Sequence, residues 1–219
     1  MKHDCTGVIL AGGRNKRLPG IKKSFHEIRG RKIMEIIHGL FSSLFDEVII
    51  VANDPGAFAE WDGTIVSDIY PCGCPLAGIH AGLFYASTPN VFVSACDTPF
   101  LERRLAEYIL SRTKPGIDVV IPETDAGLEP LCAVYSKQCL PQIEKNLENN
   151  IFKIKKFFKD RRVLKIPMDK IQEIDPGIDS FFNINTPEDL ARARTMAVKQ
   201  GETHGHECND STDKIPTGL

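Results

Sequence analysis

Residues 6–23 read TGVILAGGRNKRLPGIKK, an apolar run followed by two glycines and a basic segment. The apolar run predicts a β-strand that is buried on both faces, as in a parallel sheet. Gly12 and Gly13 permit a tight turn and let successive backbone N–H groups approach an anion. Arg17 and Lys23 then add the positive charge that a triphosphate attracts. This order of features predicts an α/β fold with a phosphate-binding site after its first strand.

The rest of the chain alternates between short apolar strands and short amphipathic helices. We expect strands at residues 48–52, 65–67, 91–96, 117–121, 131–135, 163–166 and 182–184, and helices at 32–44, 76–86, 101–111, much of 136–158 and 187–198. Pro122 should end the strand before it, and Asn149-Asn150 should break the long helical stretch. The alternation predicts a single Rossmann-like three-layer domain over residues 1–200, with a mostly parallel central sheet. The polar residues 201–219 are expected to be a disordered tail.

The composition excludes several classes of protein. The chain has 219 residues, of which 42% are hydrophobic and 26% charged, and a formal net charge of −2. These proportions are typical of one globular domain and speak against a general nucleic-acid binder. No apolar run approaches the roughly 20 residues of a membrane span, and no secretory signal is visible. Seven cysteines without such a signal favour reduced thiols in the cytoplasm, and Cys72-Gly73-Cys74 lacks the C-x-x-C spacing of redox or zinc motifs.

Two acidic residues follow expected strands, where ligands of α/β sheets bind. Asp97 comes directly after the strand 91–96, and a carboxylate in this position can hold Mg²⁺. Its structural alternative is an N-cap for the next helix. Asp68 follows the strand 65–67, and its alternative is a turn residue before Pro71. The two carboxylates could together bind one cation that also takes phosphate oxygens.

The basic segment matches neither the P-loop pattern nor the dinucleotide fingerprint G-x-G-x-x-G. It resembles the nucleotidyltransferase signature L-A-G-G-x-[SA]-x-R-[ML]-G-x-x-K, and the chain more narrowly resembles the MobA family, the molybdenum cofactor guanylyltransferases. Further segments agree with this family in the same order along the chain. They are Val51-Ala52-Asn53, Asp68 ahead of Pro75-Leu76-Ala77-Gly78, CDTPFL at 96–101 and FNINTPEDL at 182–190. The resemblance covers roughly residues 6–198.

The resemblance implies that GMP is transferred from GTP to the phosphate of molybdopterin cofactor, with release of pyrophosphate. It implies Mg²⁺ as cofactor and apo-molybdoenzymes or their chaperones as candidate protein partners. It assigns GTP binding to Leu10, Ala11, Gly12, Gly13, Lys23, Asn53, Asp68 and Asp97, catalysis to Arg17, Lys23 and Asp97, the Mg²⁺ ion to Asp97, and the pterin side to Asn183 and Asn185. The first three would read the guanine edge through backbone groups. Both asparagines should face one side of a short strand, because side chains alternate along a strand.

Some residues depart from the family pattern. Pro19 and Cys74 stand where the family usually has glycine. Two alternatives therefore stay open: a related nucleotidyltransferase that uses CTP or another phosphorylated substrate, and a non-catalytic homologue that only binds GTP. For Asn53, Asn183 and Asn185, turn formation and helix capping are the structural alternatives.

Overall fold

The computed structural model describes residues 4–12 and 23–205. A β-sheet forms the middle of the fold. Its strands run in the order β10-β7-β9-β6-β1-β4-β5, and β8 pairs with β7. Their bounds are β1 Thr6–Leu10, β4 Val48–Val51, β5 Thr64–Val66, β6 Asn90–Ala95, β7 Val119–Thr124, β8 Gly127–Leu128, β9 Cys132–Ser136 and β10 Val163–Ile166. Strands β6, β1, β4 and β5 are parallel, as are β7 and β10, whereas β9 is antiparallel to both of its neighbours. The expectation of a mostly parallel sheet is confirmed.

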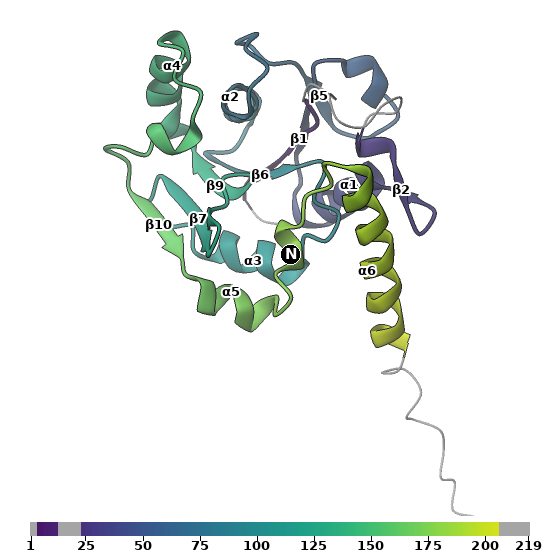
Figure 1. Cartoon of the computed structure of the whole chain (residues 1–219). Helices are drawn as coiled ribbons and strands as arrows, with labels where there is room; N and C mark the ends of the chain where they lie inside the picture. Colours follow the sequence, from purple (N-terminus) through teal and green to yellow (C-terminus); the bar gives the residue numbers. More distant parts are fainter. Residues whose placement is uncertain (1–3, 13–22, 206–219) are drawn as a thin grey trace, which may run out of the picture.

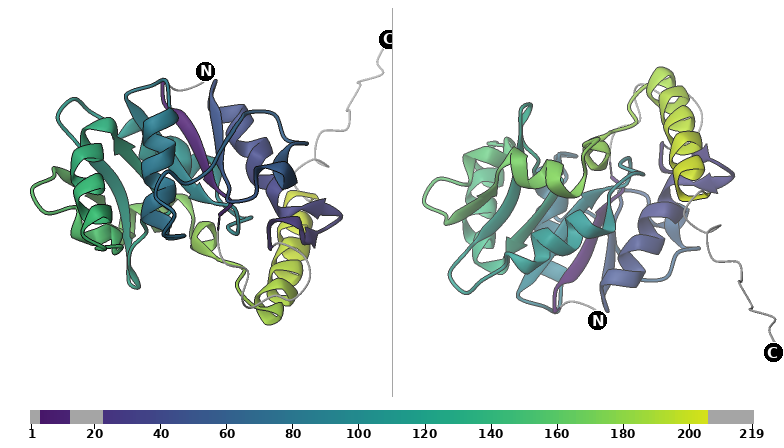
Figure 2. Two further views of the ribbon diagram at one scale, coloured as in Figure 1. Left: turned by 90° about the horizontal axis from the view of Figure 1, so that it is seen from above. Right: turned by 90° about the horizontal axis from the view of Figure 1, so that it is seen from below.

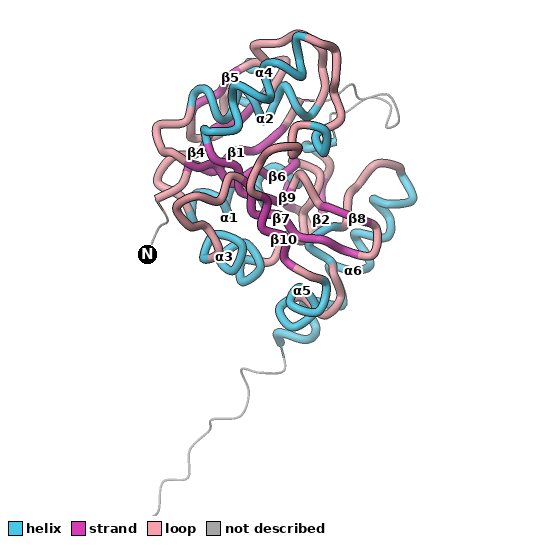
Figure 3. The backbone as a smooth tube through the Cα atoms, turned by 90° about the vertical axis from the view of Figure 1, so that its left-hand side faces the viewer, coloured by secondary structure: helices cyan, strands magenta, loops and turns pink. Residues whose placement is uncertain are grey.

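Helices cover both faces of this sheet, which gives the three layers seen in Figures 1 and 2. Helices α1 (Ile33–Leu44), α3 (Arg103–Ser111) and α5 (Met168–Ile174) lie on one face, and α2 (Pro75–Tyr85) and α4 (Leu140–Glu148) on the other. Helix α6 (Pro187–Gly205) packs beside the small hairpin of β2 (Glu27–Ile28) and β3 (Arg31–Lys32). Short 3-10 helices are η1 Lys23–Phe25, η2 Pro55–Phe58, η3 Lys137–Cys139, η4 Ile154–Lys156 and η5 Asp179–Phe181. Figure 3 shows the strands between the two helical layers.

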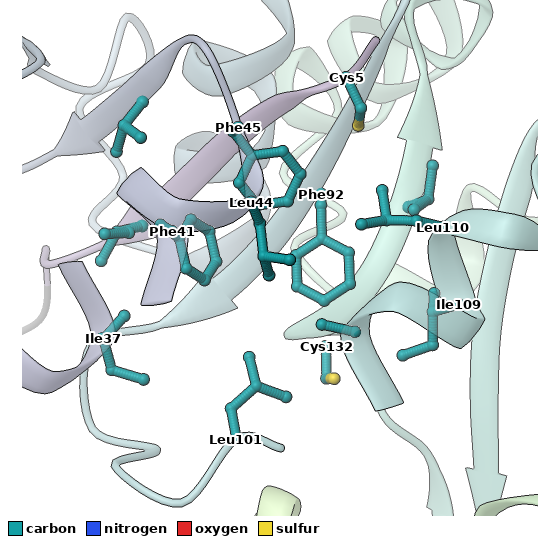
Figure 4. Close-up of a cluster of buried hydrophobic side chains, with 14 of the residues drawn as sticks. Cys5, Ile37, Phe41, Leu44, Phe45, Phe92, Leu101, Ile109, Leu110 and Cys132 are labelled. Atoms are coloured by element: carbon teal, nitrogen blue, oxygen red, sulfur yellow. The ribbon is translucent and has the colours of Figure 1, made fainter. Parts of the chain in front are cut away.

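Apolar residues on alternate sides of the strands build one core on each face of the sheet. In β1, Ile9 belongs to the core under α1 and α3, while Val8 and Leu10 belong to the core under α2 and α4. This explains why the strand reads as a continuous apolar run. The rings of Phe41, Phe45 and Phe92 form the centre of the first core, with centroids 5.2–5.9 Å apart (Figure 4).

Several expected boundaries differ from the observed ones. Pro122 lies inside β7 and does not end it. The pairing of β7 with β9 stops at Val120, so β9 does not need the backbone N–H that proline lacks. The break near Asn149-Asn150 is confirmed, but only the short η4 follows it before β10. Residues 182–184 form no strand. Helix α6 runs to Gly205, past the expected end at residue 198; residues 206–219 of the expected tail lie outside the described part of the chain. No described helix is long and apolar enough to cross a membrane.

Glu47 ties together the start of β1 and the loop before β6. Its Oε2 accepts hydrogen bonds from Thr6 Oγ1 at 2.5 Å, Ser87 N at 2.9 Å and Ser87 Oγ at 2.8 Å. Partial burial would raise the pKa of this carboxyl, but these hydrogen bonds outweigh burial and lower the pKa. The charged form is therefore favoured in the folded state.

We expect Glu47→Gln to lower the free energy of unfolding by about 1 kcal/mol at neutral pH, since charge-assisted hydrogen bonds become neutral ones. Folding lowers the pKa of the Glu47 carboxyl, so its stabilisation is fully present at a pH above the pKa of this group in the unfolded chain. The stabilisation is lost as the pH falls through the lower pKa of the folded protein. Urea unfolding should be measured from neutral to acidic pH. The free energies of unfolding of wild type and variant should become equal at low pH. Glu35→Gln, at an exposed ion pair with Arg31, is the control and should change stability by a few tenths of a kcal/mol at most. Equal effects of the two variants would contradict the role of Glu47.

Candidate active site

The carboxyl ends of β1, β4, β5 and β6 meet at one edge of the sheet. Hydrogen bonds continue past the strands there: Cys96 N donates to Leu10 O at 3.1 Å, Ala11 N to Val51 O at 2.8 Å, and Ala52 N to Val66 O at 2.8 Å. The chain passes from β1 to β4 and β5 on one side and then returns to β6 on the other. This makes β1 the topological switch point, where open α/β sheets bind ligands.

Gly12 and Asn53 are neighbours at this edge. A Cβ atom placed on Gly12 would lie 3.4 Å from Asn53 Nδ2, and both residues are exposed. The sheet itself uses Leu10 O and Ala11 N. Leu10, Ala11 and Gly12 were expected to contact the base through backbone groups. The first of these groups that the sheet hydrogen bonds above do not use are the Ala11 carbonyl and the Gly12 N–H, just beyond the end of β1.

Asp97 lies one residue beyond the Cys96 amide that binds Leu10 O, and its side chain is half-buried. The turn that carries it is fixed by Thr98, whose Oγ1 donates to Ala95 O at 2.9 Å and lies 3.1 Å from Ser94 Oγ. Sequence reasoning missed this pair, although a threonine directly after the acid was a signal. Helix α3 has Glu102 as its N-cap, so the alternative of Asp97 as the N-cap is wrong.

Asp68 is two residues past β5, and partial burial raises the pKa of its carboxyl. Strands β1 and β4 lie between β5 and β6. With neighbouring strands about 4.8 Å apart, the ends of β5 and β6 are roughly 14 Å apart. Among the described residues, no three His, Cys, Asp or Glu side chains gather as a metal site would require. The strand order thus speaks against Asp68 and Asp97 sharing one cation.

Residues 182–186 lie against the Asp97 turn, because Ile184 N donates to Asp97 O at 3.0 Å. They form a helix cap: the N–H groups of Asn185 and Thr186 donate to Asp189 Oδ2 at 3.0 and 2.9 Å, and Asp189 N donates to Thr186 Oγ1 at 3.1 Å. These N–H groups lower the pKa of Asp189.

The asparagines of this segment do not lie as expected from a strand. Residues 182–184 form no strand, so strand alternation does not direct the side chains of Asn183 and Asn185 to one side. Asn183 is exposed, and its Nδ2 donates to Phe181 O at 3.1 Å. Turn formation and capping, the structural alternatives, are present in this segment.

An aromatic cluster lies at η1, which begins at the last residue of the basic segment. Gly13 and Arg17 lie outside the described residues, and for Lys23 only its place at the start of η1 is described. The ring of Phe25, in η1, stacks on Trp61 with centroids 5.5 Å apart and planes at 5°. Lys32 Nζ lies 5.2 Å from the Trp61 ring centroid and 2.8 Å from Glu60 Oε1. Sequence reasoning missed this cluster, although Trp61 is the only tryptophan of the chain.

Comparison with known proteins gives the family and the relatives of this chain. Residues 7–165 match the family described as "MobA-like NTP transferase domain". The chain is 41% identical over 196 residues to the molybdenum cofactor guanylyltransferase of Desulfosudis oleivorans, covering 90% of this chain and 96% of the relative. It is 37% identical over 192 residues to a probable molybdenum cofactor guanylyltransferase of Pelotomaculum thermopropionicum, covering 88% and 93%. The crystal structure of molybdopterin-guanine dinucleotide biosynthesis protein A from Archaeoglobus fulgidus superposes with a TM-score of 0.79 at 29% identity, covering 89% and 99%.

Proposed function

Because the chain belongs to the MobA-like NTP transferase family, we propose that it is a molybdenum cofactor guanylyltransferase. It transfers GMP from GTP to the phosphate of molybdopterin cofactor, and pyrophosphate leaves. The names of its relatives and of the superposed structure support this reaction.

The observation that carries the proposal is the hydrogen bond between Cys96 N and Leu10 O. It brings the beginning of the glycine turn and the Asp97 turn to the same edge of the sheet. A triphosphate bound to the N–H groups of Gly12 and Gly13 would therefore also be within the region that Asp97 occupies. Had these two segments lain on opposite sides of the molecule, no single nucleotide could have contacted both.

We assign base recognition to the Ala11 carbonyl, because the sheet already uses Leu10 O and Ala11 N. A backbone acceptor in this position complements guanine, which carries an N2–H donor. The Gly12 N–H belongs to the same trans peptide and points the opposite way, so we assign it to the triphosphate. We propose that Asn53, which neighbours Gly12, and Asp68 help to fix the base or ribose. Leu10 then acts by positioning Ala11.

Arg17 and Lys23 are proposed to bind the phosphates and to neutralise charge on the leaving pyrophosphate. The attacking group is a phosphate of the second substrate, which is already anionic, so no general base is needed. The protein's task is to align the two substrates. Asn183 and Asn185, in the segment that touches the Asp97 turn, are proposed to contact the pterin-bearing substrate.

The residues present fit a Mg²⁺ ion. Mg²⁺ usually takes one or two protein carboxylates, with substrate phosphates and water as its other ligands. Asp97 offers one carboxylate at the end of β6, so the ion would depend on the nucleotide for further oxygens. When bound, such an ion neutralises charge on the phosphates.

The test is to supply the purified protein with molybdopterin, Mg²⁺ and either GTP, CTP or ATP and to measure pyrophosphate. We expect pyrophosphate to be released with GTP and not with CTP or ATP. Release with CTP and not with GTP would identify the related cytidylyltransferase. Binding of GTP without release of pyrophosphate would identify a non-catalytic homologue.

We also expect GTP to change the fluorescence of Trp61, because its partner Phe25 lies in η1, directly after the basic segment. A titration followed at the tryptophan emission should saturate at the same GTP concentration as the transfer rate. Trp61→Phe keeps an aromatic partner for Phe25 and removes the signal, which makes it the control. Unchanged emission at a GTP concentration that saturates the enzyme would contradict the link between the cluster and the phosphate site.

Since the reaction consumes GTP, we propose a cytoplasmic location. We further propose that the finished dinucleotide cofactor passes to apo-molybdoenzymes or their chaperones. Co-purification of radiolabelled product with such an apoprotein, and its absence with an unrelated protein, tests this transfer.

A further inference from the structure

We propose that Cys72 and Cys74 are a reversible dithiol–disulfide pair, a redox-sensitive site in the loop between β5 and α2. Their Sγ atoms lie 2.9 Å apart and are hydrogen-bond partners. A disulfide bond measures about 2.05 Å, so the sulfur atoms need to approach by only about 0.9 Å. The proposed transfer reaction assigns no role to these two thiols.

The backbone around the pair supports this approach. Gly73 has φ of +60°, a left-handed conformation that glycine adopts without strain and other residues rarely adopt. Cys72 N donates to Tyr70 O at 2.8 Å, and Cys74 O accepts from Ala77 N at 3.0 Å in the first turn of α2. Both cysteines are therefore held in place from outside the three-residue segment.

The pair is also more accessible than most other thiols in the described residues. Cys72 and Cys74 are half-buried, whereas Cys5, Cys132 and Cys139 are at most 5% exposed. Burial raises the pKa of Cys5 and of Cys139 to about 12 and raises that of Cys132 further, so these thiols are protonated and poorly reactive. The half-buried Cys96 serves as an internal comparison.

The oxidant in this step is a small-molecule disulfide such as oxidised glutathione. The Cys72 thiolate attacks one sulfur of the oxidant, forms a mixed disulfide and expels one glutathione thiolate. The Cys74 thiol then loses its proton and attacks the Cys72 sulfur, which forms the Sγ–Sγ bond and expels the second glutathione. Two electrons pass from the two cysteines to the glutathione disulfide. Burial and the Cys72 thiol raise the pKa of Cys74 to about 11, so we assign the first attack to Cys72.

A disulfide that closes so short a loop constrains the unfolded chain very little, so a structural staple is not its role. Strained or accessible disulfides are instead labile and suited to regulation. The loop joins Asp68 to α2, and α2 packs on Leu10 through Gly78, where a Cβ would lie 3.1 Å from Leu10 Cδ2. Fixing the loop covalently is expected to weaken GTP binding, an effect that rests on the proposed function.

The chemical test does not depend on the transfer reaction. Reduced full-length protein is incubated with oxidised glutathione, remaining thiols are alkylated, and peptides are mapped by mass spectrometry. We expect the peptide with residues 72–74 to lose two hydrogens, to resist alkylation at both cysteines and to regain both thiols with dithiothreitol. Cys74→Ser should accumulate a glutathione adduct on Cys72, and Gly73→Ala should slow disulfide formation at least tenfold. Two alkylated cysteines, or glutathione retained by the wild type, would overturn the proposal.

The functional test compares reduced and oxidised wild type in guanylyl transfer. Oxidation should raise the KM for GTP at least threefold, with recovery in dithiothreitol. Cys72→Ser, which lacks the thiol assigned to the first attack, should keep its KM in the presence of the oxidant. An unchanged KM despite a complete disulfide would refute the regulatory effect. A reduced wild type that transfers no GMP would instead refute the proposed function and leave the result of the peptide mapping standing.

Discussion

Replacing Asp97 with asparagine is expected to lower kcat for guanylyl transfer about 100- to 1000-fold, the usual cost of losing one group that stabilises charge in the transition state. The fold should survive, because the group that receives the hydrogen bond from Ile184 is the backbone carbonyl of Asp97 and not its side chain. Asparagine has nearly the same shape, but it lacks the negative charge that would hold a cation and carries an NH2 donor in place of one oxygen. Pyrophosphate release at saturating GTP measures the loss, and urea unfolding measures stability.

The control is Glu102→Gln, an exposed acid close by in the chain whose side chain makes no capping hydrogen bond to α3. It should retain wild-type kcat. If Asp97→Asn kept more than a tenth of the wild-type activity, the proposed role of Asp97 would be wrong. If it lost stability together with activity, Asp97 would be a structural residue of the turn.

The sequence was sufficient to predict the layers of the fold. Continuous apolar runs such as residues 6–11 and 48–52 predicted buried strands, and their alternation with helices predicted a mostly parallel sheet. The direction of β9 was not predictable, because a strand reads the same whichever way its neighbours run. The prediction that Pro122 ends its strand was wrong for a similar reason. A strand tolerates proline wherever its neighbour needs no N–H from that residue, and the register with β9 decides where this is so.

The candidate site was predictable where it depends on strands that end together. Gly12 and Asp97 both follow buried strands, and the structure brings their segments to one edge. The order of strands across the sheet was not encoded locally, so Asp68 and Asp97 were expected to be closer than the two intervening strands allow. The stack of Phe25 on Trp61 joins segments far apart in the sequence, and neither residue shows a pattern that predicts the contact.

The second large effect concerns stability: Gly82→Ala is expected to lower the free energy of unfolding by about 2 kcal/mol through overpacking. A Cβ atom on Gly82 would lie 2.6 Å from Val8 Cγ1 and 2.9 Å from Val8 Cγ2. Val8 is fully buried in β1, in the middle of the sheet, so it cannot move aside easily. The close approach of α2 to β1 thus requires glycine here.

Gly39→Ala is the matched control, because it makes the same change in another helix. Gly39 is exposed in α1, and a Cβ there would meet only Arg31 Nη2 at 3.7 Å. Since alanine is a better helix former than glycine, this variant should gain about 0.5–1 kcal/mol. Urea unfolding of the two variants beside the wild type should give changes of opposite sign. A gain in both would mean that α2 can shift away from β1, and the packing that positions Leu10 and the start of the glycine turn would then be looser than the structure shows.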